Sequence, residues 1–203
     1  IKKELPNNVT LVAVSKTKSE EEILQAYNSG HKIFGENKVQ ELVEKYENLP
    51  KDIEWHMIGH LQRNKVKYIA PFVSLIHGTD SEKLLKEINK RAKKNSRIIN
   101  CLLQVHIAEK STKFGFSLSE INDIMQRSSE FENVNIIGLM GMASFTDTIS
   151  QIEKEFCSLQ QIYKNHTSFT TLSMGMSGDY KSAIQYGSNM IRLGSVIFGN
   201  RNY

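Results

Sequence analysis

The sequence holds only two cysteines among its 203 residues, Cys101 and Cys157, and neither belongs to a Cys-x-x-Cys pair. This argues against a disulfide framework and against a zinc site, and it fits a reducing compartment. No run of eighteen apolar residues occurs, and no charged-then-apolar leader precedes Ile1. We therefore expect a cytoplasmic protein with neither a membrane span nor a secretion signal.

A strong charge of one sign is also missing. The chain has 26 Lys and Arg residues against 22 Asp and Glu residues, a net charge of +4. Nucleic-acid surfaces usually interleave aromatic with basic residues or carry a known motif, and neither pattern is visible here. The basic residues at 90, 91, 93 and 94 are typical of a solvated helix face. We expect no nucleic-acid partner, whereas small anionic ligands are compatible with the charge.

Apolar runs typical of strands alternate with amphipathic segments along the whole chain. Helix signals lie between the runs: Ser19 with Glu22 forms a capping box, and Gly30 follows the helix end. Further helices are expected from a cap at Asp80 or Ser81, from a start at Ser117 or Ser119, and from a helical period after Asp147. The eight runs typical of strands are residues 9–15, 31–37, 53–59, 72–78, 97–107, 134–142, 169–176 and 189–195.

Strand followed by helix, repeated many times, implies parallel strands joined by right-handed crossovers. Eight such units predict an α/β fold, a (β/α)8 TIM barrel, as a single domain over residues 1–203. The rival is an open doubly wound sheet. No Gly-x-Gly-x-x-Gly follows the first strand, which weakens a dinucleotide-binding version of that rival.

The first strand ends in LVAVSKTK, residues 11–18, so Lys16 stands at its carboxyl end. In a TIM barrel that end faces the mouth, where enzymes of this fold place their chemistry. An apolar wall behind the ammonium favours the neutral amine, which can attack a carbonyl and form a Schiff base. The alternative is a lysine whose charged end reaches water beyond the rim, and the first strand alone favours that alternative.

Two glycine and serine turns follow the last two strands. TTLSMGMSGDY places Gly175 and Gly178 around Ser177, and MIRLGSVIFGNR places Gly194 and Ser195 before a further helical turn. Glycine lets backbone N–H groups approach an anion, serine adds a hydroxyl donor, and a helix N-terminus adds its dipole. Barrels commonly bind phosphate after strands 7 and 8, so the turns predict a phosphate site. The alternative is a pair of tight strand-to-helix turns.

A lysine beside a phosphate site suggests pyridoxal phosphate, an aldehyde that carries a phosphate. The segments LVAVSKTK, FGENKVQE, WHMIGHLQRNK, KFGF, LSMGMSGD and IRLGSVIFGNRNY resemble, in this order and across nearly the whole chain, the pyridoxal phosphate homeostasis protein family. The resemblance implies an alanine-racemase-like barrel, similar to the N-terminal domain of alanine racemase. It also implies pyridoxal 5′-phosphate (PLP) as the cofactor, held as a Schiff base on Lys16.

The resemblance assigns further residues to the cofactor. Ser177, Gly194 and Ser195 match phosphate-binding positions, and Arg192 matches an arginine that faces the pyridine nitrogen. A guanidinium stays protonated, so it donates to that nitrogen and disfavours a proton there, which makes the ring a poorer electron sink.

Asn37 and His56 lie in motifs that line the same mouth, and the resemblance implies that they contact the cofactor too. His56 and His60 lack a third ligand at suitable spacing, so we expect no metal site; His56 belongs to the barrel wall and His60 to a loop. Lys110 and Lys113 could meet an anion, but solvated lysines are the safer interpretation. His106 stands where the family commonly has asparagine, so that segment receives no site role.

The resemblance implies a protein that binds PLP reversibly and takes part in its intracellular homeostasis, with PLP-dependent apoenzymes as candidate recipients. Racemases of this fold carry a second domain with a catalytic tyrosine, whereas this sequence ends at residues 200–203, after its eighth strand and helix. That favours a carrier over an enzyme. We also expect a monomer or weak homodimer. Two alternatives stay open: a small PLP-dependent racemase or lyase, and a phosphosugar-type barrel enzyme with another role for Lys16.

Overall fold

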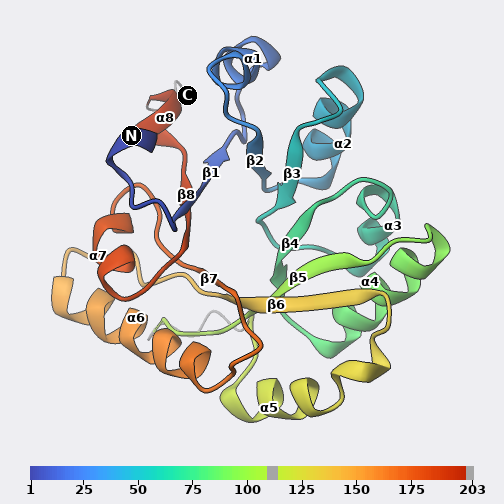
Figure 1. Ribbon diagram of the computed structural model, residues 1–203, viewed down its shortest axis with the longest axis vertical. Helices are drawn as coiled ribbons and strands as arrows, with labels where there is room; N and C mark the ends of the chain where they lie inside the picture. The colour runs from blue at the N-terminus through green and yellow to red at the C-terminus, as the bar shows by residue number, and fades with distance from the viewer. Residues whose placement is uncertain (109–113, 200–203) are drawn as a thin grey trace.

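Eight parallel strands close into a barrel in chain order in the computed structural model, which describes residues 1–108 and 114–199 (Figure 1). The first strand pairs with the second on one side and with the eighth on the other, which closes the ring. The predicted (β/α)8 barrel is confirmed, and the open sheet is excluded. The strands are β1 Thr10–Val14, β2 Ile33–Glu36, β3 Glu54–Met57, β4 Leu75–Thr79, β5 Ile99–Gln104, β6 Val134–Met140, β7 Thr171–Ser173 and β8 Met190–Leu193.

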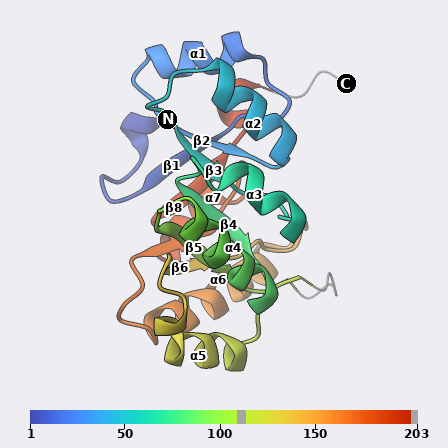
Figure 2. The same ribbon diagram turned by 90° about the vertical axis from the view of Figure 1, so that its right-hand side faces the viewer.

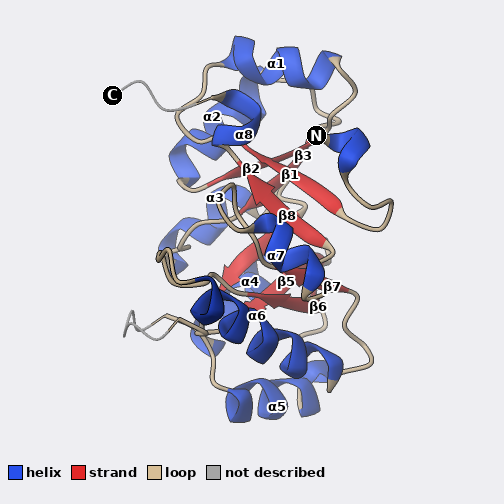
Figure 3. Cartoon of the chain, turned by 90° about the vertical axis from the view of Figure 1, so that its left-hand side faces the viewer, coloured by secondary structure: helices blue, strands red, loops and turns tan. Residues whose placement is uncertain are grey.

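Helices surround the barrel on its outer side, as Figures 2 and 3 show from two opposite directions. Among them, none of the described helices is long and apolar enough to cross a membrane. The helices are α1 Glu20–Asn28, α2 Val39–Asn48, α3 Val66–Ile69, α4 Glu82–Lys94, α5 Leu118–Gln126, α6 Ile149–Lys164, α7 Tyr180–Gln185 and α8 Ser195–Phe198, with 3-10 turns η1 Lys2–Glu4, η2 Arg63–Lys65 and η3 Ser128–Glu130.

The sequence signals for helix starts correspond to real caps. Ser19 and Glu22 form the predicted capping box of α1, and Ser117 forms a second one with Glu120 at the start of α5. Ser81, rather than Asp80, caps α4. These caps fix where each helix leaves its loop, because each satisfies N–H groups that have no partner within the helix.

Two layers of apolar side chains hold the fold together. The outer layer lies between strands and helices and includes Phe34, Trp55 and Leu42, all fully buried. The inner layer fills the barrel, with Val12 and Leu102 among its members. Each fully buried side chain of this size contributes about 1.5–3 kcal/mol. Alternation along the strands sends successive residues to the two layers, which explains why the strands are almost continuously apolar.

The fifth predicted strand is shorter than its apolar run. β5 ends at Gln104, and Val105 instead forms an isolated bridge with Phe116. Phe116 is therefore brought back beside the end of β5, just before α5 begins. Lys110 and Lys113 lie outside the described residues.

Candidate functional site

The carboxyl ends of β1, β2 and β8 place three of the predicted site residues side by side. β1 is paired with both neighbours, so Lys16 follows it with Asn37 on the β2 side and Gly194 on the β8 side. A Cβ atom added to Gly194 would lie 3.5 Å from Val14, the last residue of β1. Lys16 and Asn37 are both partly buried.

The backbone around Lys16 is held from both sides. The Nζ atom of Lys45 donates to the carbonyl oxygen of Ser15 at 2.7 Å, and the N–H of Thr17 donates to Oε1 of Glu41 at 2.6 Å. Thr17 has a φ of +65°, a left-handed conformation that is uncommon for a β-branched residue. Such a conformation persists only where its surroundings impose it, so the carboxylate of Glu41 helps to set the turn that carries Lys16.

Lys45 also belongs to a buried ionic cluster on the outer side of the barrel. Lys45 lies 2.8 Å from Glu36 and 2.7 Å from Glu41, and the Ser15 hydroxyl donates to Glu36 at 2.6 Å. The side chain of Glu36 is fully buried and that of Lys45 is 6% exposed. Burial raises the pKa of the Glu36 carboxyl, and the charge of Lys45 opposes that rise. Breaking such a pair is costly because it leaves a buried charge without its partner.

The two glycine and serine turns after β7 and β8, residues 175–179 and 194–195, contact each other. The N–H of Gly194 donates to Oγ of Ser177 at 3.2 Å, and the N–H of Met176 donates to Oδ1 of Asp179 at 2.6 Å. Ser177 is partly buried and Ser195 is exposed. Helices α7 and α8 are only six and four residues long. We therefore expect their dipoles to contribute less to anion binding than the hydroxyl and N–H groups of the turns do.

Gly175 is required by the shape of the first turn. Its φ is +98°, and a Cβ atom there would lie 2.6 Å from the Cβ of Ala183. A side chain at this position would therefore push α7 away from β7. Gly194 differs, because it has a negative φ and room for a Cβ atom within the chain.

Arg192 is buried inside the barrel, 4% exposed, on the strand before the second turn. Its Nη1 atom donates to the carbonyl oxygen of Ser173 at 3.0 Å and to the Ser173 hydroxyl at 2.6 Å, while Nη2 donates to the carbonyl oxygen of Gly141 at 3.1 Å. Burial lowers the pKa of Arg192 to about 10, and the Asp179 carboxylate opposes the shift. The guanidinium is therefore charged at neutral pH. These bonds use at most three of its five N–H groups among the described residues.

His56 lies on β3 and is buried in the barrel wall, where its Nδ1 atom is 3.1 Å from Nε2 of His77. Burial lowers the pKa of His56 to about 3 and that of His77 well below its ordinary value, so both rings are neutral. His60 instead lies in the exposed loop after β3, with Nδ1 3.0 Å from Asp80. The two histidines of this segment are thus separated, and the described part of the chain gathers no set of three His, Cys, Asp or Glu side chains that could hold a metal.

Comparisons with known proteins agree with this architecture. The alanine racemase, N-terminal domain, family matches residues 1–202. The pyridoxal phosphate homeostasis protein of Aquifex aeolicus is 37% identical over 203 residues, covering 97% of this chain and 89% of the relative. The chain belongs to the pyridoxal phosphate homeostasis protein family. The resemblance inferred from the six sequence segments is therefore confirmed.

Solved structures place the family within a wider fold. PipY of Synechococcus elongatus, whose structure has PLP bound, superposes with a TM-score of 0.88 at 31% identity, covering 98% of this chain and 96% of that chain. An alanine racemase of Clostridium difficile superposes with a TM-score of 0.80 at 12% identity and covers 55% of that chain. At that identity the likeness concerns the barrel fold alone.

Sequence reasoning missed several residues that organise this site of the homeostasis-family barrel. His77 and Ser173 connect His56 to Arg192, and Glu36 and Lys45 support the turn that carries Lys16. The one local signal was the spacing of Glu41 and Lys45, four residues apart on α2. That spacing predicts an ordinary helix-surface ion pair and says nothing of burial.

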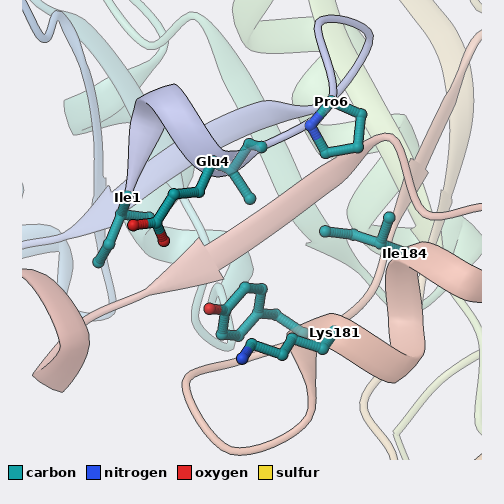
Figure 4. Close-up of a pocket in the computed structure, with 7 residues that line it drawn as sticks. Ile1, Glu4, Pro6, Lys181 and Ile184 are labelled. Atoms are coloured by element: carbon teal, nitrogen blue, oxygen red, sulfur yellow. The ribbon is translucent and has the colours of Figure 1, made fainter.

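A separate open pocket lies on the outer side of the barrel, between the N-terminal segment and α7 (Figure 4). It has a volume of about 360 Å³, and in Figure 4 Glu4 and Lys181 face it from opposite walls. Leu5, Tyr180 and Ile184 pack against the outer face of β1 and β8 beneath it. The pocket thus opens away from the barrel interior that holds Arg192.

Proposed function

We propose that this chain binds pyridoxal 5′-phosphate at the barrel mouth, with Lys16 as its covalent attachment point, and takes part in the cellular supply of that cofactor. The observation that carries the proposal is the meeting of three kinds of group at adjacent strand ends. These are the amine of Lys16 just after β1, a buried guanidinium on β8, and two turns in contact that carry hydroxyl and N–H donors. The names of the homologues and the PLP bound to PipY support it.

The residues present fit this cofactor. The turn at Gly175 excludes any side chain on the α7 side, which keeps the backbone of residues 175–179 close to β8. A Cβ atom at Gly194 would not clash with the rest of the chain, so the absence of a side chain there leaves space that a phosphate would use. The donors are one permanent cation, a serine hydroxyl and backbone N–H groups, a set that suits a phosphate and a pyridine nitrogen.

Each residue would have a distinct role. Ser177, Gly194 and Ser195 would bind the phosphate, and the N–H of Gly194 would exchange its bond with Ser177 for one with a phosphate oxygen. Arg192 would direct an N–H toward the ring nitrogen, while Asn37 would line the β2 side. His56 would support the cofactor-binding residues from inside the barrel, because its Nδ1 atom is already bonded to His77.

Lys16 would hold the cofactor through its Nζ atom. The clamp formed by Lys45 and Glu41 on the neighbouring backbone would keep this amine at the mouth. When bound, PLP supplies an aldehyde that bonds reversibly to amines and a ring that can accept electrons. Reversible attachment is what a carrier requires, since the cofactor must be able to leave.

The carrier role is tested by transfer. The purified chain is loaded with PLP, freed of excess cofactor by gel filtration, and mixed with a PLP-free aminotransferase whose activity is then followed. We expect activity to return, and we expect the Lys16→Ala variant, treated identically, to restore much less because it retains less cofactor. A chain that emerges from gel filtration without PLP would contradict the proposal, as would loaded protein that never reactivates the enzyme.

Arg192 also bears on the alternative of a small racemase. A charged guanidinium donates to the ring nitrogen and disfavours a proton there, so the ring withdraws electrons less strongly. We expect loaded protein incubated with L- or D-alanine in deuterated water to give at most slow α-proton exchange. Rapid multiple-turnover racemisation would favour the enzyme instead.

A further inference from the structure

Four buried side chains from four different strands form a continuous row of hydrogen bonds across the barrel interior. His56 on β3 lies 3.1 Å from His77 on β4, which lies 3.1 Å from the hydroxyl of Ser173 on β7. That hydroxyl lies 2.6 Å from Nη1 of Arg192 on β8. All four residues are at most 4% exposed. The row ends at the guanidinium that faces the proposed cofactor site.

The two histidines could in principle be ordered in either direction. A neutral imidazole has one N–H donor and one acceptor nitrogen, so each ring passes a hydrogen bond along in a single sense. In one sense Ser173 donates to Nδ1 of His77, and Nε2 of His77 donates to Nδ1 of His56. In the other sense every donor is reversed, and His77 donates to the Ser173 oxygen that already accepts from Arg192.

The charge of Arg192 selects between these senses. A guanidinium can only donate, so the lone pairs of Ser173 Oγ must face it. The hydroxyl proton is then available to point toward Nδ1 of His77, the acceptor next in the row, although the second lone pair of the oxygen permits either sense. In the reversed sense the positive ends of both imidazole dipoles would point at the cation inside a barrel of low dielectric, which is unfavourable.

We propose that His77 and Ser173 are positioning residues for Arg192, acting through one fixed order of hydrogen bonds that runs from Arg192 to Ser173, His77 and then His56. This order holds one edge of the guanidinium against β7, so that its remaining N–H groups face the mouth. The row cannot relay a proton to the site, because it ends on a donor that retains its protons. The consequence for the cofactor ring rests on the proposed function, but the order of the bonds does not.

The order is tested on the 15N-labelled full chain without cofactor, by long-range proton–nitrogen NMR of the imidazole rings. We expect His77 and His56 both to carry their proton on Nε2 and to show an acceptor-type shift at Nδ1. Single substitutions assign the signals, and His60, whose side chain is 51% exposed and whose Nδ1 atom lies 3.0 Å from Asp80, provides the reference for an exposed ring. A proton on Nδ1 of His77, or a charged ring at neutral pH, would overturn the proposal.

The positioning role is tested with a matched pair of variants. His77→Leu removes the acceptor for Ser173, whereas the side-chain oxygen of His77→Asn can replace Nδ1. We expect His77→Leu to weaken PLP binding about tenfold, the loss of about one hydrogen bond to a charged group, and to change the 15N shift of the bound pyridine nitrogen. His77→Asn should restore both.

Thermal unfolding of each variant separates positioning from folding. If both variants lose stability alike while PLP affinity and the nitrogen shift stay unchanged, His77 is structural only and the proposal is wrong. Should His77→Leu not fold, Ser173→Ala removes the same link and is expected to give the same tenfold loss. Binding by the unsubstituted chain is measured first: if it binds no PLP the proposed function fails, while the tautomer experiment still decides the order of the bonds.

Discussion

The ammonium nitrogen of Lys45 lies 2.7 Å from the carbonyl oxygen of Ser15, the residue that precedes Lys16. This bond links a helix on the outside of the barrel to the backbone of the residue proposed to attach the cofactor. Because Lys45 also neutralises Glu36, one buried cation serves both the fold and the geometry of the mouth.

Lys45→Met should therefore be strongly destabilising. It leaves the fully buried Glu36 carboxylate without a cation, and such losses cost about 3–5 kcal/mol. Urea unfolding measures the change. Lys86→Met is the matched control, since Lys86 also pairs with a glutamate four residues away at 2.7 Å but is 62% exposed. We expect the control to lose at most about 0.5 kcal/mol. Equal losses in the two variants would contradict the buried role of Lys45.

The buried histidines predict a decline in stability at acid pH. In the folded chain burial lowers the pKa of His56 to about 3, whereas the ordinary value is 6.5. Between these two pH values the unfolded chain therefore binds a proton at His56 that the folded chain does not bind. The stability that is present above pH 6.5 is lost as the pH falls toward 3. The slope is at most about 1.4 kcal/mol per pH unit for each such histidine.

His56→Leu isolates this effect. Urea unfolding at several values between pH 7 and 5 should show a shallower decline in the variant, by about one proton's contribution. Carboxylates titrate in both proteins, so their contribution cancels in the difference. Parallel curves would mean that His56 is not kept neutral by burial.

Ser177→Ala should weaken binding of PLP but not of pyridoxal. One hydrogen bond to a charged group contributes about 1.5–3 kcal/mol, which corresponds to about a 10- to 150-fold change in Kd. Titrations with the two ligands measure the difference. Ser158→Ala on α6, an exposed serine that bonds to its own helix, is the control. Equal loss of affinity for both ligands would show that Ser177 does not contact the phosphate.

The sequence alone was sufficient to predict the barrel fold and to predict which residues lie at the carboxyl ends of its strands. Strands buried on both faces are continuous apolar runs, so all eight were recognisable, and barrel topology then brings Lys16, Arg192 and Gly194 to one mouth. Ser19 was recognisable as a cap because a capping box is local, whereas the sequence left the start of α5 open between Ser117 and Ser119, and the structure selects Ser117.

Contacts that depend on strand register were not predictable in the same way. His77 and Ser173 are 96 positions apart and meet only because β4 and β7 face each other across the barrel. Lys45 has the sequence pattern of a surface lysine on α2. In the structure it is buried, and its ammonium group donates to the carbonyl oxygen of Ser15, 30 positions earlier in the chain. His56 was expected in the barrel wall and His60 in a loop, but nothing in the sequence indicated that His77 is the partner of His56.

The attachment of PLP to Lys16 is tested most directly by chemical trapping. The loaded chain is reduced with borohydride, digested and analysed by mass spectrometry, with Lys16→Ala treated in parallel. The account predicts a pyridoxyl-phosphate label on Lys16 and loss of the principal label in the variant, which should fold normally because a lysine at the rim contributes little to the core. A label that is absent from Lys16 in the unsubstituted chain, or equally abundant in both proteins, would contradict it.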